Sequence, residues 1–180
     1  MLHRLVGGAI GLYGGVLWGP SEIAITSKRG TISVVGPHGQ SFRVLALGKQ
    51  LLRNGAGAVR LLGWAGNGRS VVASIACTGG FECTDRIVSI DDDSGQVRGA
   101  RSLEPQIAVS GTEFEISAID PVSLSRDGSV ALAQQVVFSL DLSRKRPRPK
   151  LKARVVQVAL SGTAPPKVLV GEGATPDWNL

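Results

Sequence analysis

A turn followed by a β-branched run decides how this sequence folds: Gly-Trp-Ala-Gly-Asn-Gly-Arg-Ser-Val-Val-Ala-Ser, residues Gly63–Ser74. An aromatic residue precedes a tight polar turn, and small and β-branched residues follow it. Asn-Gly strongly favours a tight chain reversal, and β-branched residues favour strands. The stretch therefore predicts two antiparallel strands joined by a short turn.

The same order of residues returns along the chain. Val122–Ala133 repeats it with Asp-Gly in the turn, Trp18–Ile25 has an aromatic, a short turn and a β-branched run, and Ala174–Leu180 begins a further copy. The leading apolar residues are Trp18, Trp64, Leu124 and Trp178. Their successive spacings are 46, 60 and 54 residues. Periods of this size are typical of propeller blades with loops of variable length.

The composition fits a chain of short strands. Of 180 residues, 43% are hydrophobic, 24 are glycine and only 4% are aromatic, which favours a globular protein with many tight turns. The longest apolar runs are shorter than a membrane span requires, so no membrane span is predicted. Five glycines interrupt the apolar stretch Leu5–Trp18, and we expect a β segment there in preference to a signal peptide.

Glycine and proline turns divide the chain into three units, expected at residues 16–47, 59–103 and 118–170, with residues 171–180 starting a further one. Residues 104–117 are expected to join the last two units and to contain a short extra strand pair. The predicted fold is all-β and propeller-like, with about three four-stranded antiparallel blades in an incomplete ring. A β-sandwich with a similar number of strands is the alternative fold.

An incomplete ring leaves a sheet face and an edge strand without a partner. We therefore expect either that the chain is a fragment of a larger propeller or that it associates with itself through open blade edges. Two copies joined head to tail would supply six blades, within the usual range for propellers.

Around Trp64 the motif reads Trp-x-x-Asn-Gly-Arg-x-Val-Val-Ala, and a strand ending at Asp91 and a Gly-x-Val-Arg run ending at Arg98 follow. This pattern resembles the TolB-like β-propeller repeat. The first unit has Pro-Ser-Glu where the family turn usually has Pro-Asp-Gly, and Leu124 replaces the aromatic of the third unit. The resemblance implies a non-catalytic binding or scaffolding module with a protein or peptide partner, in a periplasmic or extracellular location.

Propellers usually engage partners through turns that converge at one end of the channel. The turns expected to face a partner contain Gly66, Asn67, Arg69, Arg126 and Asp127. The three tryptophans are predicted to fill space between sheets. The rival function is that of an accessory propeller domain of a peptidase or carbohydrate-active enzyme whose catalytic domain lies outside this chain.

Basic residues are concentrated in one short segment. The net charge is +6, and seven of the 20 basic residues are Arg144, Lys145, Arg146, Arg148, Lys150, Lys152 and Arg154. Without them the chain is close to neutral, so nucleic acid is not the favoured partner. We expect a solvated hairpin tip extended by its prolines, with polyanion binding as the alternative function.

No pattern for catalysis is found, and the chain is predicted to be no enzyme and to hold no metal or cofactor. The sequence has no Gly-x-Ser-x-Gly elbow and no phosphate loop, and its two histidines are far apart. The acidic run Asp91–Asp93 is interpreted as a hairpin turn closed by Gly95. Cys77 and Cys83 would close a short hairpin, either as a disulfide or as two free thiols. A disulfide would imply an oxidising compartment.

Overall fold

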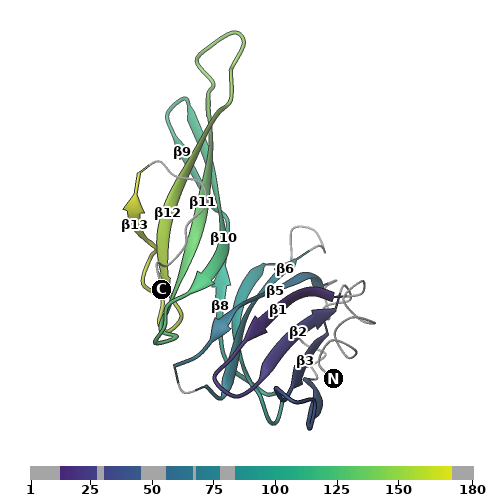
Figure 1. The fold of residues 1–180 in the computed structure, drawn as a ribbon. Helices are drawn as coiled ribbons and strands as arrows, with labels where there is room; N and C mark the ends of the chain where they lie inside the picture. Colours follow the sequence, from purple (N-terminus) through teal and green to yellow (C-terminus); the bar gives the residue numbers. More distant parts are fainter. Residues whose placement is uncertain (1–12, 28–30, 46–55, 67, 78–83, 172–180) are drawn as a thin grey trace.

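The computed structural model describes residues 13–27, 31–45, 56–66, 68–77 and 84–171. Within these residues every regular element is a strand, and the strands form three antiparallel sheets (Figure 1). The predicted all-β class is confirmed, and the three sheets do not close into a ring. The described residues include no helix that could cross a membrane.

Each sheet is formed from consecutive strands. The first sheet contains β1 (Tyr13–Trp18), β2 (Ile23–Ser27), β3 (Ile32–Val35) and β4 (Phe42–Leu45). The second sheet contains β5 (Ala56–Trp64), β6 (Ser70–Cys77), β7 (Asp85–Asp91) and β8 (Val97–Leu103). The third sheet contains β9 (Gln106–Ser110), β10 (Glu113–Leu124), β11 (Val130–Asp141), β12 (Lys150–Ala159) and β13 (Lys167–Val170).

The third sheet differs from the expected four-stranded unit because it has a fifth strand. The short strand pair predicted between the second and third units is present, but it belongs to the third sheet: β9 pairs with the first half of β10. The strand β10 then continues without a break from Glu113 to Leu124. Side chains alternate across the sheet as far as Pro121, where the register shifts, and no glycine interrupts the strand.

The repeat predicted around Trp64 and Leu124 is present in the backbone. Trp64 pairs with Val71, and Leu124 pairs with Ala131, so both turns have the same length. In both strands the register shifts just before this residue, between Leu61 and Gly63 in β5 and between Pro121 and Ser123 in β10. Both turns contain a glycine with positive φ, 65° at Gly68 and 73° at Gly128, a conformation that other residues rarely adopt. The second and third units therefore share one local structure.

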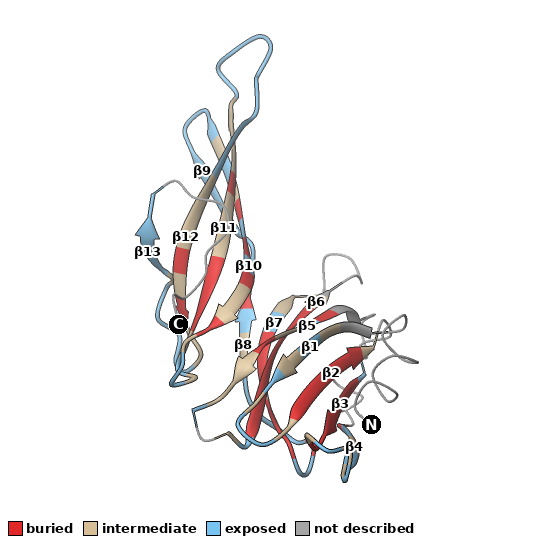
Figure 2. Cartoon of the chain, in the orientation of Figure 1, coloured by how far each residue is buried: buried red, intermediate tan, exposed pale blue. Residues whose placement is uncertain are grey.

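The second sheet packs between the other two. One face carries Val71 and Val88, which pack with Val34 and other residues of the first sheet. The opposite face carries Val72 and Ile87, which pack with residues of the third sheet that include Ile119 and Val156. Figure 2 shows the buried residues running along the central strands. Burial on both faces explains why β6 is an almost continuous apolar run. The strand β5 lies between β1, the first strand of the first sheet, and β10 of the third sheet, because it contacts both of them.

Candidate functional site

The turns that follow β1, β5 and β10 line one pocket of about 360 Å³. The lining residues come from all three copies of the repeat: Leu17, Trp18, Gly19, Pro20, Leu62, Gly63, Trp64, Ser123, Leu124, Ser125 and Arg126. Most of them are apolar, and Arg126 carries the only charge among these lining residues. The decisive motif of the sequence therefore forms a shared surface at one end of the three sheets.

Glycines allow the three turns to approach one another closely. A Cβ atom at Gly19 would lie 2.5 Å from Cε2 of Trp64, and a Cβ atom at Gly63 would lie 2.6 Å from Cβ of Leu124. Both distances are far below ordinary van der Waals contact. The leading apolar residue of each later unit thus packs against a glycine of the unit before it.

The turns predicted to face a partner are held against each other. The N–H of Gly66 donates a hydrogen bond to the carbonyl oxygen of Asp127 at 3.3 Å. A Cβ atom at Gly128 would lie 2.7 Å from Cα of Ala65. Asn67 lies outside the described residues. The structure thus brings the second and third turns together, which sequence spacing alone does not indicate.

The charged residues of these turns have different surroundings. The Asp127 carboxylate accepts hydrogen bonds from the hydroxyls of Ser125 at 2.6 Å and Ser129 at 2.7 Å. These hydroxyl donors and the Ser129 N–H lower the pKa of Asp127 to about 2. The Asp127 carboxylate therefore stabilises the turn through these hydrogen bonds. Arg126 is exposed and lines the pocket, so its guanidinium is accessible to a ligand. The backbone carbonyl of Arg69 accepts a hydrogen bond from the Asp92 N–H at 3.1 Å.

The tryptophans do not all pack as predicted. Trp64 packs against the core between the first and second sheets, in agreement with the prediction. Trp18 is 66% exposed, so the packing prediction is wrong for this residue. Trp18 pairs with Ile23, on the face of the first sheet that points away from the second. Its indole is a large exposed apolar group at the edge of the pocket. Trp178 lies outside the described residues.

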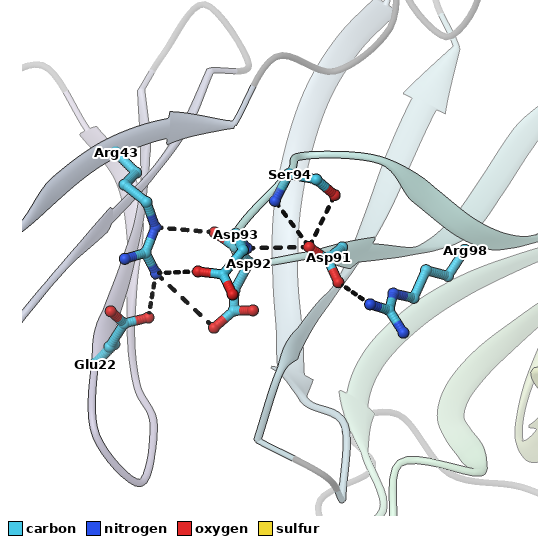
Figure 3. Close-up of polar contacts among 7 residues, drawn as sticks. All are labelled: Glu22, Arg43, Asp91, Asp92, Asp93, Ser94 and Arg98. Atoms are coloured by element: carbon cyan, nitrogen blue, oxygen red, sulfur yellow. Dashed lines mark hydrogen bonds and ion pairs between the residues drawn. The ribbon is translucent and has the colours of Figure 1, made fainter.

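The acidic run at Asp91 forms a hairpin turn, as predicted (Figure 3). Asp91 Oδ1 accepts hydrogen bonds from the N–H of Ser94 at 2.8 Å and from its hydroxyl at 2.8 Å. The Arg98 guanidinium pairs with Oδ2 of Asp91. The Ser94 donors and Arg98 lower the pKa of Asp91 to about 2. Gly95 has a φ of 70° and donates its N–H to the carbonyl oxygen of Asp91 at 3.0 Å, which closes the turn.

Arg43 connects this turn to the first sheet, and no local pattern predicts this contact because the partners of Arg43 lie far along the chain. Its Nη2 atom lies 2.7 Å from Oε2 of Glu22, and its Nε–H donates to the carbonyl oxygen of Asp92 at 3.1 Å. Burial and the nearby carboxylates of Asp93 and Glu22 raise the pKa of Asp92. No group of three potential metal ligands is present in the part of the chain that the structure describes.

We expect Asp91→Asn and Asp92→Asn to change stability in different ways. Asp91 has a lowered pKa in the folded state, so its contribution is present above the unfolded pKa of about 3.9 and is lost as the pH falls through about 2. Asp91→Asn should therefore lower the urea midpoint at pH 7, and its difference from the native chain should shrink below pH 4. Asp92→Asn removes a carboxylate whose charge is disfavoured by folding, so its midpoint at pH 7 should be equal or higher. Equal losses in both variants at pH 7 would contradict these roles.

Four of the seven basic residues, Arg144, Lys145, Arg146 and Arg148, lie in the exposed tip of the β11–β12 hairpin, which projects away from the first two sheets (Figure 1). Lys150, Lys152 and Arg154 lie in β12 and pair with β11, so the tip is shorter than predicted. Arg144 pairs with Asp141 at 3.0 Å. The other six basic residues form no ion pair with the described part of the chain. The geometry of the predicted tip is therefore present, and its binding of polyanions stays a prediction.

Other predicted features fall in turns or outside the described residues. His38 is exposed in the turn between β3 and β4, where its N–H donates to Oε1 of Gln40 at 3.0 Å. The predicted pair of Cys77 and Cys83 cannot be placed, because Cys83 and the side chain of Cys77 lie outside the described residues. A scan against protein-family models and a search of the curated proteins found no match to this chain.

Proposed function

We propose that the chain is a non-catalytic binding or scaffolding module of the TolB-like propeller type, and that it binds a protein or peptide at the end where its turns converge. The observation that carries this proposal is the pocket lined by all three copies of the repeat. A periplasmic or extracellular location belongs to the same proposal.

The neighbouring first strands support a propeller-like arrangement. In a propeller the innermost strands of adjacent blades lie side by side around the axis. Here β5, the first strand of the second sheet, contacts both β1 and β10. The strand β1 is the first strand of the first sheet, and β10 begins the four-stranded meander β10 to β13 of the third sheet. The turns that follow them meet at one end for the same reason, so the pocket lies where propellers commonly bind partners.

The lining of the pocket indicates the chemistry of its ligand. The Trp18 indole and the side chains of Leu17 and Leu124 offer apolar surface, and Arg126 offers a guanidinium at the edge. A guanidinium binds carboxylates through charge-assisted hydrogen bonds. The pocket therefore suits a peptide that places an apolar side chain inside and a carboxylate next to Arg126.

We expect the chain to select peptides of this kind from a random dodecamer library. Binding of the selected peptides, labelled with fluorescein, would be measured by polarisation. Arg126→Glu and Trp18→Ala should each raise the Kd at least tenfold. The first removes the guanidinium that binds the carboxylate of the peptide, and the second removes the indole that contacts its apolar side chain. The matched control is Lys145→Glu, which makes the same change of charge at the hairpin tip and should leave the Kd within about twofold.

Two results of these experiments would contradict the proposal. The library could yield no binding peptide, or the selected peptides could bind Arg126→Glu as tightly as the native chain. Acidic peptides that lose affinity only in Lys145→Glu would assign binding to the basic hairpin tip instead.

A further inference from the structure

The outer half of the third sheet has one apolar face that no other part of the described structure covers. The register places Ile107, Ile116, Phe138 and Leu151 in one row across β9, β10, β11 and β12. A second row contains Val109, Phe114 and Leu140. Residues opposite each other in an antiparallel ladder share a face, so these side chains form one continuous apolar surface. We call it the outer apolar face.

The exposure of these residues shows that the face is open. Ile107 is 65% exposed and Leu151 is 70% exposed, while Phe114 and Phe138 are half-buried among their neighbours. Figure 2 shows mostly exposed and intermediate residues along this part of the sheet, and the buried Ser117 and Val137 there lie on its opposite face. Large contiguous apolar surfaces are uncommon on soluble monomers and mark interaction sites.

The opposite face of the same strands is polar. There the row that follows β10 and β11 contains Glu115 and Ser139, and Lys150 continues it on β12. Nearer the body of the protein this opposite face packs on the second sheet through Ile119 and Val156. The third sheet therefore has one face that is polar or packed on the second sheet and one face that is apolar and open. The side chains of Lys150 and Lys152 lie on the polar or packed face.

We propose that the outer apolar face binds the same face of a second copy of this chain, in a two-fold symmetric dimer. The two apolar rows contain no charged side chain, so two copies would meet without like-charge repulsion. Such a contact is self-complementary, as a two-fold interface requires. Two sheets packed in this way form a sandwich about 10 Å thick, with Phe138 and its counterpart near the centre.

The size of the face approaches what such a dimer needs. A third apolar row, Ala118, Val136 and Ala153, continues the same face toward the body of the protein. The ten side chains of the three rows each cover about 4.8 Å across the strands and about 6.8 Å along them, and so present roughly 330 Å² of projected surface per copy. Two copies therefore bury about 650 Å² of projected surface, and more accessible surface because the side chains protrude. The smallest specific interfaces bury about 1,000 Å² of accessible surface in total.

The outward side of the first sheet is a second open apolar surface. The register places Val16, Trp18, Phe42 and Val44 on it, at 46–66% exposure, around the buried Ile23, Ile25 and Val35. A head-to-tail contact would pair this side with the outer apolar face, leave one free face at each end and so continue into a ring or a larger assembly. The proposed dimer instead uses the same face of both copies and stops at twice the monomer mass, and it differs from association through open blade edges.

Sedimentation equilibrium of the full chain tests this dimer. The native chain should have twice the monomer mass of 18.7 kDa at micromolar concentration. The double variant Ile107→Glu with Val109→Glu places two charges on the outer apolar face and should raise the dimer Kd at least a hundredfold. The control is Ala108→Lys with Ser110→Lys, which places two charges on the opposite face of β9, opposite Glu115 and Glu113, and should remain dimeric. All four positions are exposed, and circular dichroism would verify that both variants fold.

Three results would overturn the proposal. The native chain could be a monomer, the control could dissociate as readily as the variant of the outer apolar face, or that variant could remain a dimer. Flotation with vesicles of phosphatidylcholine and phosphatidylserine identifies the alternative occupant. A monomer that binds these vesicles, and loses binding in Ile107→Glu with Val109→Glu, would assign the face to a membrane surface instead of a second copy.

Discussion

Gly128→Ala is expected to destabilise the chain by about 3 kcal/mol, because two costs add at this position. The φ of Gly128 is 73°, which an L residue adopts at a cost of about 1 to 2 kcal/mol. The new methyl group would also lie 2.7 Å from Cα of Ala65 and 2.8 Å from the backbone nitrogen of Gly66. These are backbone atoms of the neighbouring unit, so the clash can be relieved only by moving the second and third turns apart.

Gly162→Ala is the matched control for this prediction. Its φ of 75° is nearly the same, but a Cβ atom there would meet no atom within 4 Å. We expect a loss of about 1 kcal/mol from backbone strain alone. Urea unfolding at pH 7 would measure both free energies. If the two variants lose equal stability, the close contact between the second and third turns does not exist.

Trp64→Ala is expected to cost about 3 kcal/mol, whereas Trp18→Ala should cost less than about 0.5 kcal/mol. The two residues occupy the same position in the repeat. Trp64 packs against the core and over Gly19, and its replacement would leave a cavity between the first and second sheets. Trp18 is mostly in solvent, so its replacement leaves no cavity.

Urea unfolding followed by circular dichroism would measure both variants without using the tryptophan signal that the substitutions remove. If Trp18→Ala lowers the free energy of unfolding as much as Trp64→Ala, Trp18 is buried between sheets. This result would agree with the repeat pattern and contradict the exposure of Trp18 in the structure. A negligible loss in Trp64→Ala would contradict the packing of the first two sheets.

The strands were predictable because their ends carry local signals. Gly68, Gly95 and Gly128 all have positive φ in tight turns, and glycine adopts this conformation at little cost. The runs rich in β-branched residues that follow the turns at Gly68 and Gly128 form β6 and β11. Such signals depend only on neighbours in sequence, so one sequence is sufficient to find them.

The contacts between units were not predictable in the same way. Trp18 and Trp64 have the same local pattern, and their burial differs because it depends on which sheet lies against them. Arg43 and Asp92 are 49 residues apart, and Arg60 pairs with Asp120 over 60 residues. Their meeting depends on how the sheets stack, which a local pattern does not encode. The outer apolar face was missed for a related reason, because it appears only when the register of four strands is known.

Successive units pack through the leading apolar residue of one unit and a glycine of the unit before it. A nuclear Overhauser spectrum of the chain with ¹³C-labelled glycine and leucine methyl groups tests this packing. We predict cross-peaks between the Trp64 ring and the Gly19 Hα protons, and between the Leu124 methyl groups and the Gly63 Hα protons. The ring of Trp64 should also shift the Gly19 Hα resonances, and Trp64→Leu should remove this shift. A folded chain that lacks both sets of cross-peaks would contradict the stacking of the three units.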